Sequence, residues 1–178
     1  MRLWVSLAGF AVAAETTNVA ARAVELDSQA ERLGLDSVWF ALMASNDALA
    51  VASAVGWAVS RISVGTAVVP IYPRHPQILA SAAKTAQAAT GGRFQLGIGL
   101  GPKDLLEPAY GLPYAQPITH LREYLGPLRP LLDGADTGYR GATVTSHPFG
   151  ATAVAGAEQA IPNPALPPVT GEPISNSS

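Results

Sequence analysis

Three glycines at alternating positions, Gly97, Gly99 and Gly101, form the most distinctive chemical pattern in this sequence. Positions without side chains let a flat aromatic ring lie against the backbone, whose amides can then supply hydrogen bonds. The same pattern is compatible with a tight turn where a strand meets a loop. It does not match the dinucleotide-binding fingerprint, because no glycine stands at the required third position and Pro102 follows where a helix should open.

Two polar residues in a proline-rich turn, Arg74 and His75, are the other candidates for chemistry. A guanidinium can hold a phosphate or a carboxylate in a two-pronged grip, or remain solvated. We therefore take Arg74 as a candidate substrate-binding residue. Histidine titrates near neutral pH, so His75 is a candidate catalytic base, although a loop residue beside a helix start is the commoner case. We see no paired carboxylates, no Ser/His/Asp order and no metal-ligand spacing, and expect no metal site.

The elements that position these residues alternate between strand and helix. Apolar and β-branched runs predict strands near residues 3–8, 35–40, 62–69 and 93–98. Helical spacing of apolar residues predicts helices near 19–33, 47–60 and 77–90, with Pro76 at the start of the third and glycines after the first and third. Ser45 or Asn46 is the expected N-cap of the second helix. This order is typical of an α/β protein with a parallel sheet.

Prolines divide the chain after the fourth strand. We expect a loop over 102–116 and a helix from Pro117 that breaks near Leu125, because Gly126, Pro127 and Pro130 follow. Residues 139–145 are β-prone. From about residue 150 the chain is rich in proline and small residues, which predicts an unstructured tail.

Composition excludes several classes of protein. The chain has 178 residues, 48% hydrophobic and 13% charged, as expected of one globular domain. Its net charge of −2 and scattered basic residues argue against nucleic acid binding, and no long apolar run argues for a membrane span. The absence of cysteine fits a cytoplasmic location. Residues 1–13 imitate a secretory signal peptide, which leaves secretion as the alternative, but we favour a first strand there.

The central stretch resembles a known family. Residues 64–70 (VGTAVVP), the pair His75-Pro76, and residues 90–94 (TGGRF) with Gly97 and Gly99 are similar to the luciferase-like monooxygenases, and most closely to their coenzyme F420-dependent relatives. Residues 30–40 (AERLGLDSVWF), before and through the second strand, resemble the same family. The resemblance covers roughly residues 1–145.

The resemblance implies a parallel (β/α)8 TIM barrel, with the ligand at the carboxyl ends of the strands. It implies an oxidoreductase or monooxygenase that transfers a hydride through bound F420, with FMN as the alternative, and acts on a small-molecule substrate. It also implies a non-proline cis peptide at about residues 67–69, behind the cofactor ring. The predicted cofactor-binding residues at these strand ends are Gly9, Thr66, Ala67, Val68, Val69, Gly99, Leu100 and Gly101. The predicted substrate-binding residues are Met43 and Arg74.

The length accounts for only half of such a barrel, since a complete one typically takes about 250 residues. We therefore expect a half-barrel over residues 1–148, made of the first four strands and helices, and a proline-rich tail over 149–178. Truncation or a frameshift near residue 150 is one explanation, and we favour it. The other is a non-catalytic half-barrel or interaction module that forms a homo-oligomer through its open sheet edges.

Overall fold

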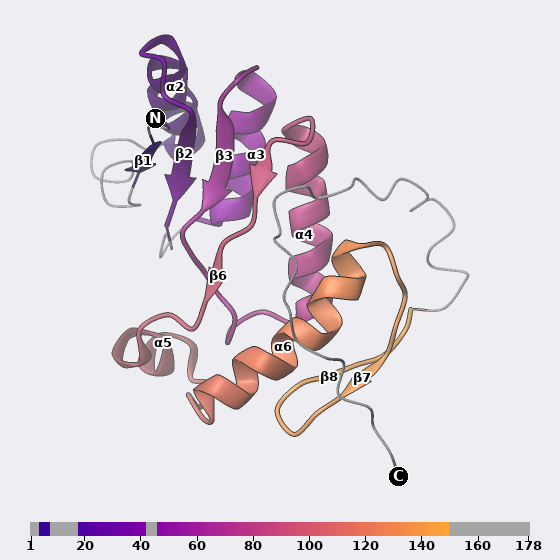
Figure 1. Ribbon diagram of the computed structural model, residues 1–178. Coiled ribbons are helices and arrows are strands. Elements are labelled where there is room, and N and C mark those ends of the chain that lie inside the picture. Colours follow the sequence, from indigo (N-terminus) through magenta and orange to yellow (C-terminus); the bar gives the residue numbers. More distant parts are fainter. Residues whose placement is uncertain (1–3, 8–17, 42–45, 150–178) are drawn as a thin grey trace.

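A parallel four-stranded sheet organises the protein (Figure 1). The computed structural model describes residues 4–7, 18–41 and 46–149. The sheet has the order β1-β2-β3-β5, built from β1 (Trp4–Leu7), β2 (Ser37–Phe40), β3 (Ser63–Thr66) and β5 (Phe94–Gln95). All three pairings are parallel. The predicted fold class and the strand at residues 4–7 are confirmed.

Three helices pack along one face of the sheet: α2 (Val19–Arg32), α3 (Ala48–Ala58) and α4 (Pro76–Ala89). Alternate strand residues such as Val38, Phe40 and Val64 point toward these helices and are fully buried. The helix ends agree with the expected glycines, because Gly34, Gly91 and Gly92 all have positive φ angles. One cap differs from the prediction. Asp47, rather than Ser45 or Asn46, is the N-cap of α3.

The opposite face of the sheet carries Trp39, whose ring lies across β3. A methyl group at Gly65 would come within 2.6 Å of that ring, so the indole needs a glycine beneath it. The indole nitrogen of Trp39 donates to Ser37 Oγ at 3.0 Å. This face is more polar than the helix-covered face and only half-buried.

Three polar side chains hold the amino-terminal end of the sheet to the helices. The Arg93 guanidinium donates to the carbonyl oxygens of Gly56, Val59 and Ile62 at 2.6–2.9 Å. The Gln87 side chain accepts from the Phe94 amide, and Glu31 accepts from the amides of residues 61 and 62. These bonds satisfy backbone groups that the end of α3 and the strand starts leave without partners.

The predicted third and fourth strands are each split in two. After β3 and β5 the chain continues into a short parallel ladder formed by β4 (Val69–Pro70) and β6 (Ile98–Gly99). This ladder lies beyond the carboxyl ends of the main strands (Figure 1). The ladder continues the direction of β3 and β5 by two residue pairs, at the edge where a ligand is expected.

The expected loop over residues 102–116 is wrong in its first half, because α5 (Lys103–Tyr110) forms there. Pro108 sits inside this helix and removes one backbone hydrogen bond from it. Leu106 is buried, and Gly111 ends the helix in the left-handed conformation. Leu106 is the only buried residue of α5, so the segment lacks the repeated apolar positions from which a helix is predicted.

The expected break near Leu125 is also wrong, because α6 continues from Pro117 to Leu132. Pro127 and Pro130 each remove one backbone hydrogen bond, at a cost of about 3 kcal/mol per proline. The same turns bury Leu128, Leu131 and Leu132, and burial of one leucine contributes about 1.5–3 kcal/mol. Burial of the three leucines is thus comparable to the cost of the two prolines, and packing against α4 maintains the helix through the position where the sequence predicts a break.

A hairpin follows α6, formed by β7 (Tyr139–Arg140) and β8 (Thr145–Ser146). This confirms the β-prone arm expected over 139–145. The hairpin lies beside α6 (Figure 1). Tyr139 packs over Gly126 of α6, where a methyl group would come within 2.6 Å of the tyrosine ring. The predicted tail and the domain boundary at 148 fall at or beyond the end of the described residues.

Candidate functional site

The candidate site is the edge where the parallel strands end, around β4 and β6. Ligands of parallel α/β sheets bind at the carboxyl ends of the strands. Two predicted site residues, Gly9 and Met43, lie outside the described residues. The others fall on this edge or on the turn beside it, and the structure shows what each of them contacts.

Thr66, at the end of β3, is fully buried and faces Gly97. Its hydroxyl oxygen accepts from the Gly97 amide at 3.0 Å and donates to the Gly97 carbonyl at 2.9 Å. The hydroxyl thus uses its donor and an acceptor within the protein. A methyl group at Gly97 would lie 1.9 Å from the Thr66 carbonyl oxygen, so the two strands approach too closely for any other residue at position 97.

The peptide bond between Ala67 and Val68 is cis. It lies within residues 67–69, where the resemblance implied a non-proline cis peptide. The Ala67 amide donates to the Phe40 carbonyl at 2.7 Å, and the Val69 amide donates to the Gly97 carbonyl at 2.9 Å. Backbone hydrogen bonds to the neighbouring strands therefore hold both sides of this peptide.

Val68 projects over the β4–β6 ladder. Its side chain is 37% exposed, and a methyl group at Gly99 would come within 2.8 Å of it. The side chain thus rests on a glycine and presents its outer surface to solvent. It forms a small apolar shelf at the carboxyl end of the sheet.

The remaining glycine of the pattern, Gly101, brings α5 against Pro70 of β4. Gly101 has a φ of +71°, and a methyl group there would meet Leu106 at 2.6 Å and Pro70 at 3.3 Å. Leu100 packs against the core and is half-buried. The alternating glycines therefore allow β4, β6 and α5 to pack closely, in addition to forming a turn.

Arg74 is held by an ion pair with Asp47. The Asp47 carboxylate also accepts from the amides of Leu49 and Ala50 as the N-cap of α3. Burial favours a higher pKa for Asp47, but the Arg74 hydrogen bond and the backbone amides outweigh it and hold that pKa below its usual value. Arg74 is thus a tie between the turn and α3, which limits its freedom to grip a substrate.

Both ring nitrogens of His75 have protein partners. Nδ1 accepts from the Gln77 amide at 3.3 Å as the N-cap of α4, and Nε2 lies 2.8 Å from the Thr145 carbonyl. The second contact requires Nε2 to carry the proton. These contacts favour a structural role, a cap for α4 and an anchor for β8.

The sequence did not predict a row of stacked aromatic rings that joins the turn after β4 to α6. The Tyr72 ring lies between Tyr114 and His120, with both centroid separations 4.4 Å. Tyr72 donates to the Ala115 carbonyl, and Tyr114 donates to the Gly101 carbonyl at 3.0 Å. Burial lowers the pKa of His120, and the smaller opposing effect of the Glu123 carboxylate does not cancel it. The three rings lie in separate segments, on the turn after β4, between α5 and α6, and in α6, so their stacking depends on tertiary contacts that the sequence does not show.

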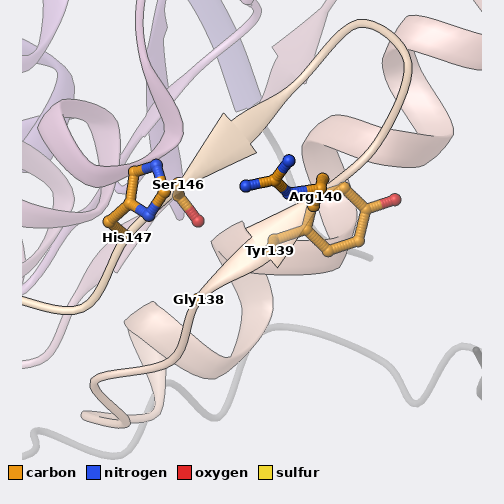
Figure 2. Close-up of a pocket in the computed structure, with 5 residues that line it drawn as sticks. All are labelled: Gly138, Tyr139, Arg140, Ser146 and His147. Atoms are coloured by element: carbon orange, nitrogen blue, oxygen red, sulfur yellow. The ribbon is translucent and has the colours of Figure 1, made fainter.

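The hairpin borders a shallow pocket of about 330 Å³, with Arg140 and His147 among its lining residues (Figure 2). Ser146 is paired with Tyr139 across the hairpin and shares its face, whereas Arg140 is on the other face by strand alternation. Ser146 is also buried. The pocket therefore does not gather its polar groups around one point.

Within residues 4–7, 18–41 and 46–149, no group of three or more histidine, aspartate or glutamate side chains could hold a metal ion. No helix in the same ranges is long and apolar enough to cross a membrane.

The fold and this strand edge define a protein built from the parallel (β/α) units of a TIM barrel. The chain belongs to the luciferase-like monooxygenase family, whose sequence model matches residues 1–170. The resemblance found in the central stretch is thereby confirmed.

Curated relatives include F420-dependent enzymes. A Mycobacterium tuberculosis protein assigned as a coenzyme F420-dependent oxidoreductase is 33% identical over 105 residues, which are 59% of this chain and 30% of that protein. The 5,10-methylenetetrahydromethanopterin reductase of Methanolobus tindarius is 31% identical over 106 residues, 59% of this chain and 32% of that protein. The chain spans about a third of the length of these relatives.

Solved structures show the same fold. The coenzyme F420-dependent tetrahydromethanopterin reductase of Methanopyrus kandleri superposes with a TM-score of 0.70 at 23% identity, covering 83% of this chain and 44% of that one. The oxygenating constituent of 3,6-diketocamphane monooxygenase from Pseudomonas putida, in complex with FMN, gives 0.72 at 17% identity, covering 83% and 44%.

Proposed function

We propose that this chain is an oxidoreductase domain that binds coenzyme F420, or alternatively FMN, at the carboxyl ends of its strands. Relatives named for F420 and a structural neighbour in complex with FMN support this choice of cofactors. The bound cofactor supplies hydride transfer. The protein's own residues bind it, orient it and exclude water.

The shelf at Val68 is the observation that carries this proposal. A flat tricyclic ring needs an apolar surface to lie on, together with backbone groups at its edge. Val68 offers that surface, and Gly99 beneath it leaves no side chain to displace it. Ala67 and Val69 complete the stretch that the ring would cover. These residues fit the aromatic ring of F420 and of FMN equally well.

Among the predicted site residues that the structure describes, none has a side chain free to act as a strong base. The Thr66 hydroxyl is bonded to Gly97, and both His75 nitrogens have partners. Arg74 is paired with Asp47. We therefore assign the protein the task of positioning and propose that the proton chemistry belongs to the cofactor and its substrate.

Titration of the purified protein with F420 and, separately, with FMN tests the proposal, with cofactor fluorescence as the readout. We expect saturable binding of one of the two. Gly99→Val should abolish it, because the added side chain occupies the place of Val68. Ala88→Ser, an exposed change on α4, is the matched control and should bind as the wild type does. A folded wild-type protein that binds neither cofactor would refute this function.

A second candidate function is a non-catalytic half-barrel that acts as an interaction module. It is favoured by the sheet itself, since β1 and β5 are the outermost of the four strands and, within the described residues, each pairs along one side only. Unpaired strand edges promote association with another chain. In this second proposal the chain associates with itself through these edges. For either candidate we propose a cytoplasmic location.

Sedimentation of the purified chain over a range of concentrations separates the two candidates. A module that associates through β1 and β5 should form defined oligomers without cofactor, and replacing Gln95 on the outer strand with lysine, whose charge opposes edge-to-edge pairing, should dissociate them. A monomer that binds F420 or FMN would support the enzyme and reject the module. Oligomers that bind neither would support the module.

A further inference from the structure

Thr66 was expected to contact the cofactor, but its surroundings indicate a different role. Its side chain has 0% exposure, and both hydrogen bonds of its hydroxyl go to a single residue, Gly97. A hydroxyl that both donates and accepts within the protein has little to offer a ligand. A threonine that only filled space at this position would not need its oxygen.

Gly97 connects this hydroxyl to the other side of the shelf. Its carbonyl accepts from Thr66 Oγ1 at 2.9 Å and also from the Val69 amide at 2.9 Å. Its amide donates to Thr66 Oγ1 at 3.0 Å. Thr66 and Val69 are therefore both hydrogen-bonded to the same residue, Gly97. The segment between them, Ala67 and Val68, is held at both ends.

The close approach of the strands makes this arrangement specific. A side chain at position 97 would clash with the Thr66 carbonyl, so only glycine lets the two backbones come this near. The hydroxyl of residue 66 reaches the Gly97 amide and carbonyl only at that separation. Thr66 and Gly97 thus form a complementary pair, which we name the Thr66–Gly97 clamp.

We propose that Thr66 is a positioning residue whose hydroxyl, through the Thr66–Gly97 clamp, fixes residues 67–69 as the floor of the cofactor site. This inference rests on the proposed function, because it assigns a role to the shelf on which the ring lies. It predicts that Thr66 contributes to cofactor binding without touching the cofactor.

Two substitutions separate the hydroxyl from the shape of the side chain. Thr66→Val keeps the shape and removes the hydroxyl, which leaves the Gly97 amide without its acceptor. Thr66→Ser keeps the hydroxyl and removes a methyl group. Thr85→Val, which removes an exposed hydroxyl from α4, is the matched control.

Amide hydrogen exchange tests the clamp without any cofactor. In Thr66→Val, the Val69 amide should exchange about tenfold faster, as expected from the loss of one buried hydrogen bond. The Phe94 amide, held by Gln87, should keep its wild-type rate. Thr66→Ser and Thr85→Val should match the wild type at both positions. A Val69 rate unchanged in Thr66→Val, or raised equally in Thr66→Ser, would overturn the proposal.

Cofactor titration tests the floor. Thr66→Val should raise the Kd for F420 or FMN about tenfold, and Thr66→Ser should restore it. Equal binding by the wild type and Thr66→Val would overturn the positioning role. If the wild type binds neither cofactor, the proposed function fails, and the exchange rates still decide whether the clamp holds residues 67–69.

Discussion

Glu123 Oε2 lies 2.7 Å from the backbone nitrogen of Thr143 and 2.8 Å from its hydroxyl oxygen. The same carboxylate accepts from the amides of Ala142 and Val144. One side chain of α6 therefore gathers the amides of the hairpin turn. A methyl group at Gly141 would collide with it at 2.4 Å, so the turn is shaped around the carboxylate.

Glu123→Gln should destabilise the protein by about 1–3 kcal/mol, because an amide group cannot accept from all of these donors and leaves some of them without partners. Urea unfolding measures the change. Glu25→Gln, which affects only an exposed ion pair with Arg22, should stay within about 0.5 kcal/mol of the wild type. Equal losses in the two variants would contradict the role of the carboxylate at the hairpin.

Asp27 should make the protein less stable as the pH rises from about 4 to about 7. Its carboxylate on α2 is fully buried and has no hydrogen-bond partner in the part of the chain that the structure describes, and burial raises its pKa to about 7. Below the unfolded-state pKa of 3.8 both states hold the proton. Between the two pKa values the unfolded state releases it more readily and is stabilised. A difference of about three pKa units corresponds to on the order of 4 kcal/mol.

Asp27→Asn should remove this pH dependence. The carboxylates of Glu31, Asp47 and Glu123 have lowered pKa values and act in the opposite direction, at acid pH, but they are unchanged in the variant and cancel in the comparison. In urea unfolding at pH 4, 6 and 8, the free energy of unfolding of the variant should increase relative to that of the wild type as the pH rises. Parallel pH profiles for the two proteins would count against a titrating Asp27.

Arg93→Lys should destabilise the protein by about 3 kcal/mol, although it preserves the charge. A lysine ammonium is a compact point charge and cannot reproduce a planar fork that reaches the carbonyls of Gly56, Val59 and Ile62 together. Thermal unfolding measures the loss. Arg140→Lys on the exposed hairpin face is the control and should leave the Tm unchanged. A small effect at position 93 would mean that water replaces the guanidinium contacts.

His75→Ala should be less stable than His75→Asn by about 1 kcal/mol, because asparagine can still cap α4 and alanine cannot, whereas both variants lose the contact with the Thr145 carbonyl. The cofactor Kd should be the same in both variants. Chemical denaturation and the fluorescence titration give the two readouts. Loss of cofactor binding or turnover in the otherwise stable asparagine variant would restore His75 as a catalytic candidate.

The parallel order of the strands could be predicted from the sequence because each buried strand is a short apolar run followed by a helix with its own stop signal. Gly34 and the glycine pair after α4 marked those stops correctly. Local rules failed at α6, where they counted the cost of Pro127 and Pro130 but not the burial of the leucines between and beyond them.

The candidate site was predictable in position but not in detail. The sequence indicated that the strand ends near residues 66–70 and 97–101 would meet. It gave no sign that the Thr66 hydroxyl would turn toward Gly97, or that Arg74 would find Asp47, because both contacts join segments 27 or more residues apart. The same holds for the stacking of Tyr72 between its two neighbours.

Arg93 has a consequence for how relatives of this protein are recognised. It is the arginine of the GGRF stretch, on which the resemblance to the family partly rests, and its three carbonyl partners lie at the amino-terminal end of the sheet, away from Val68 and Gly99. Natural selection can retain such a mark in a chain that has lost its chemistry, since it preserves only folding. A search based on GGRF should therefore collect active and inactive descendants alike, and the shelf around Val68 and Gly99 is the better place to tell them apart.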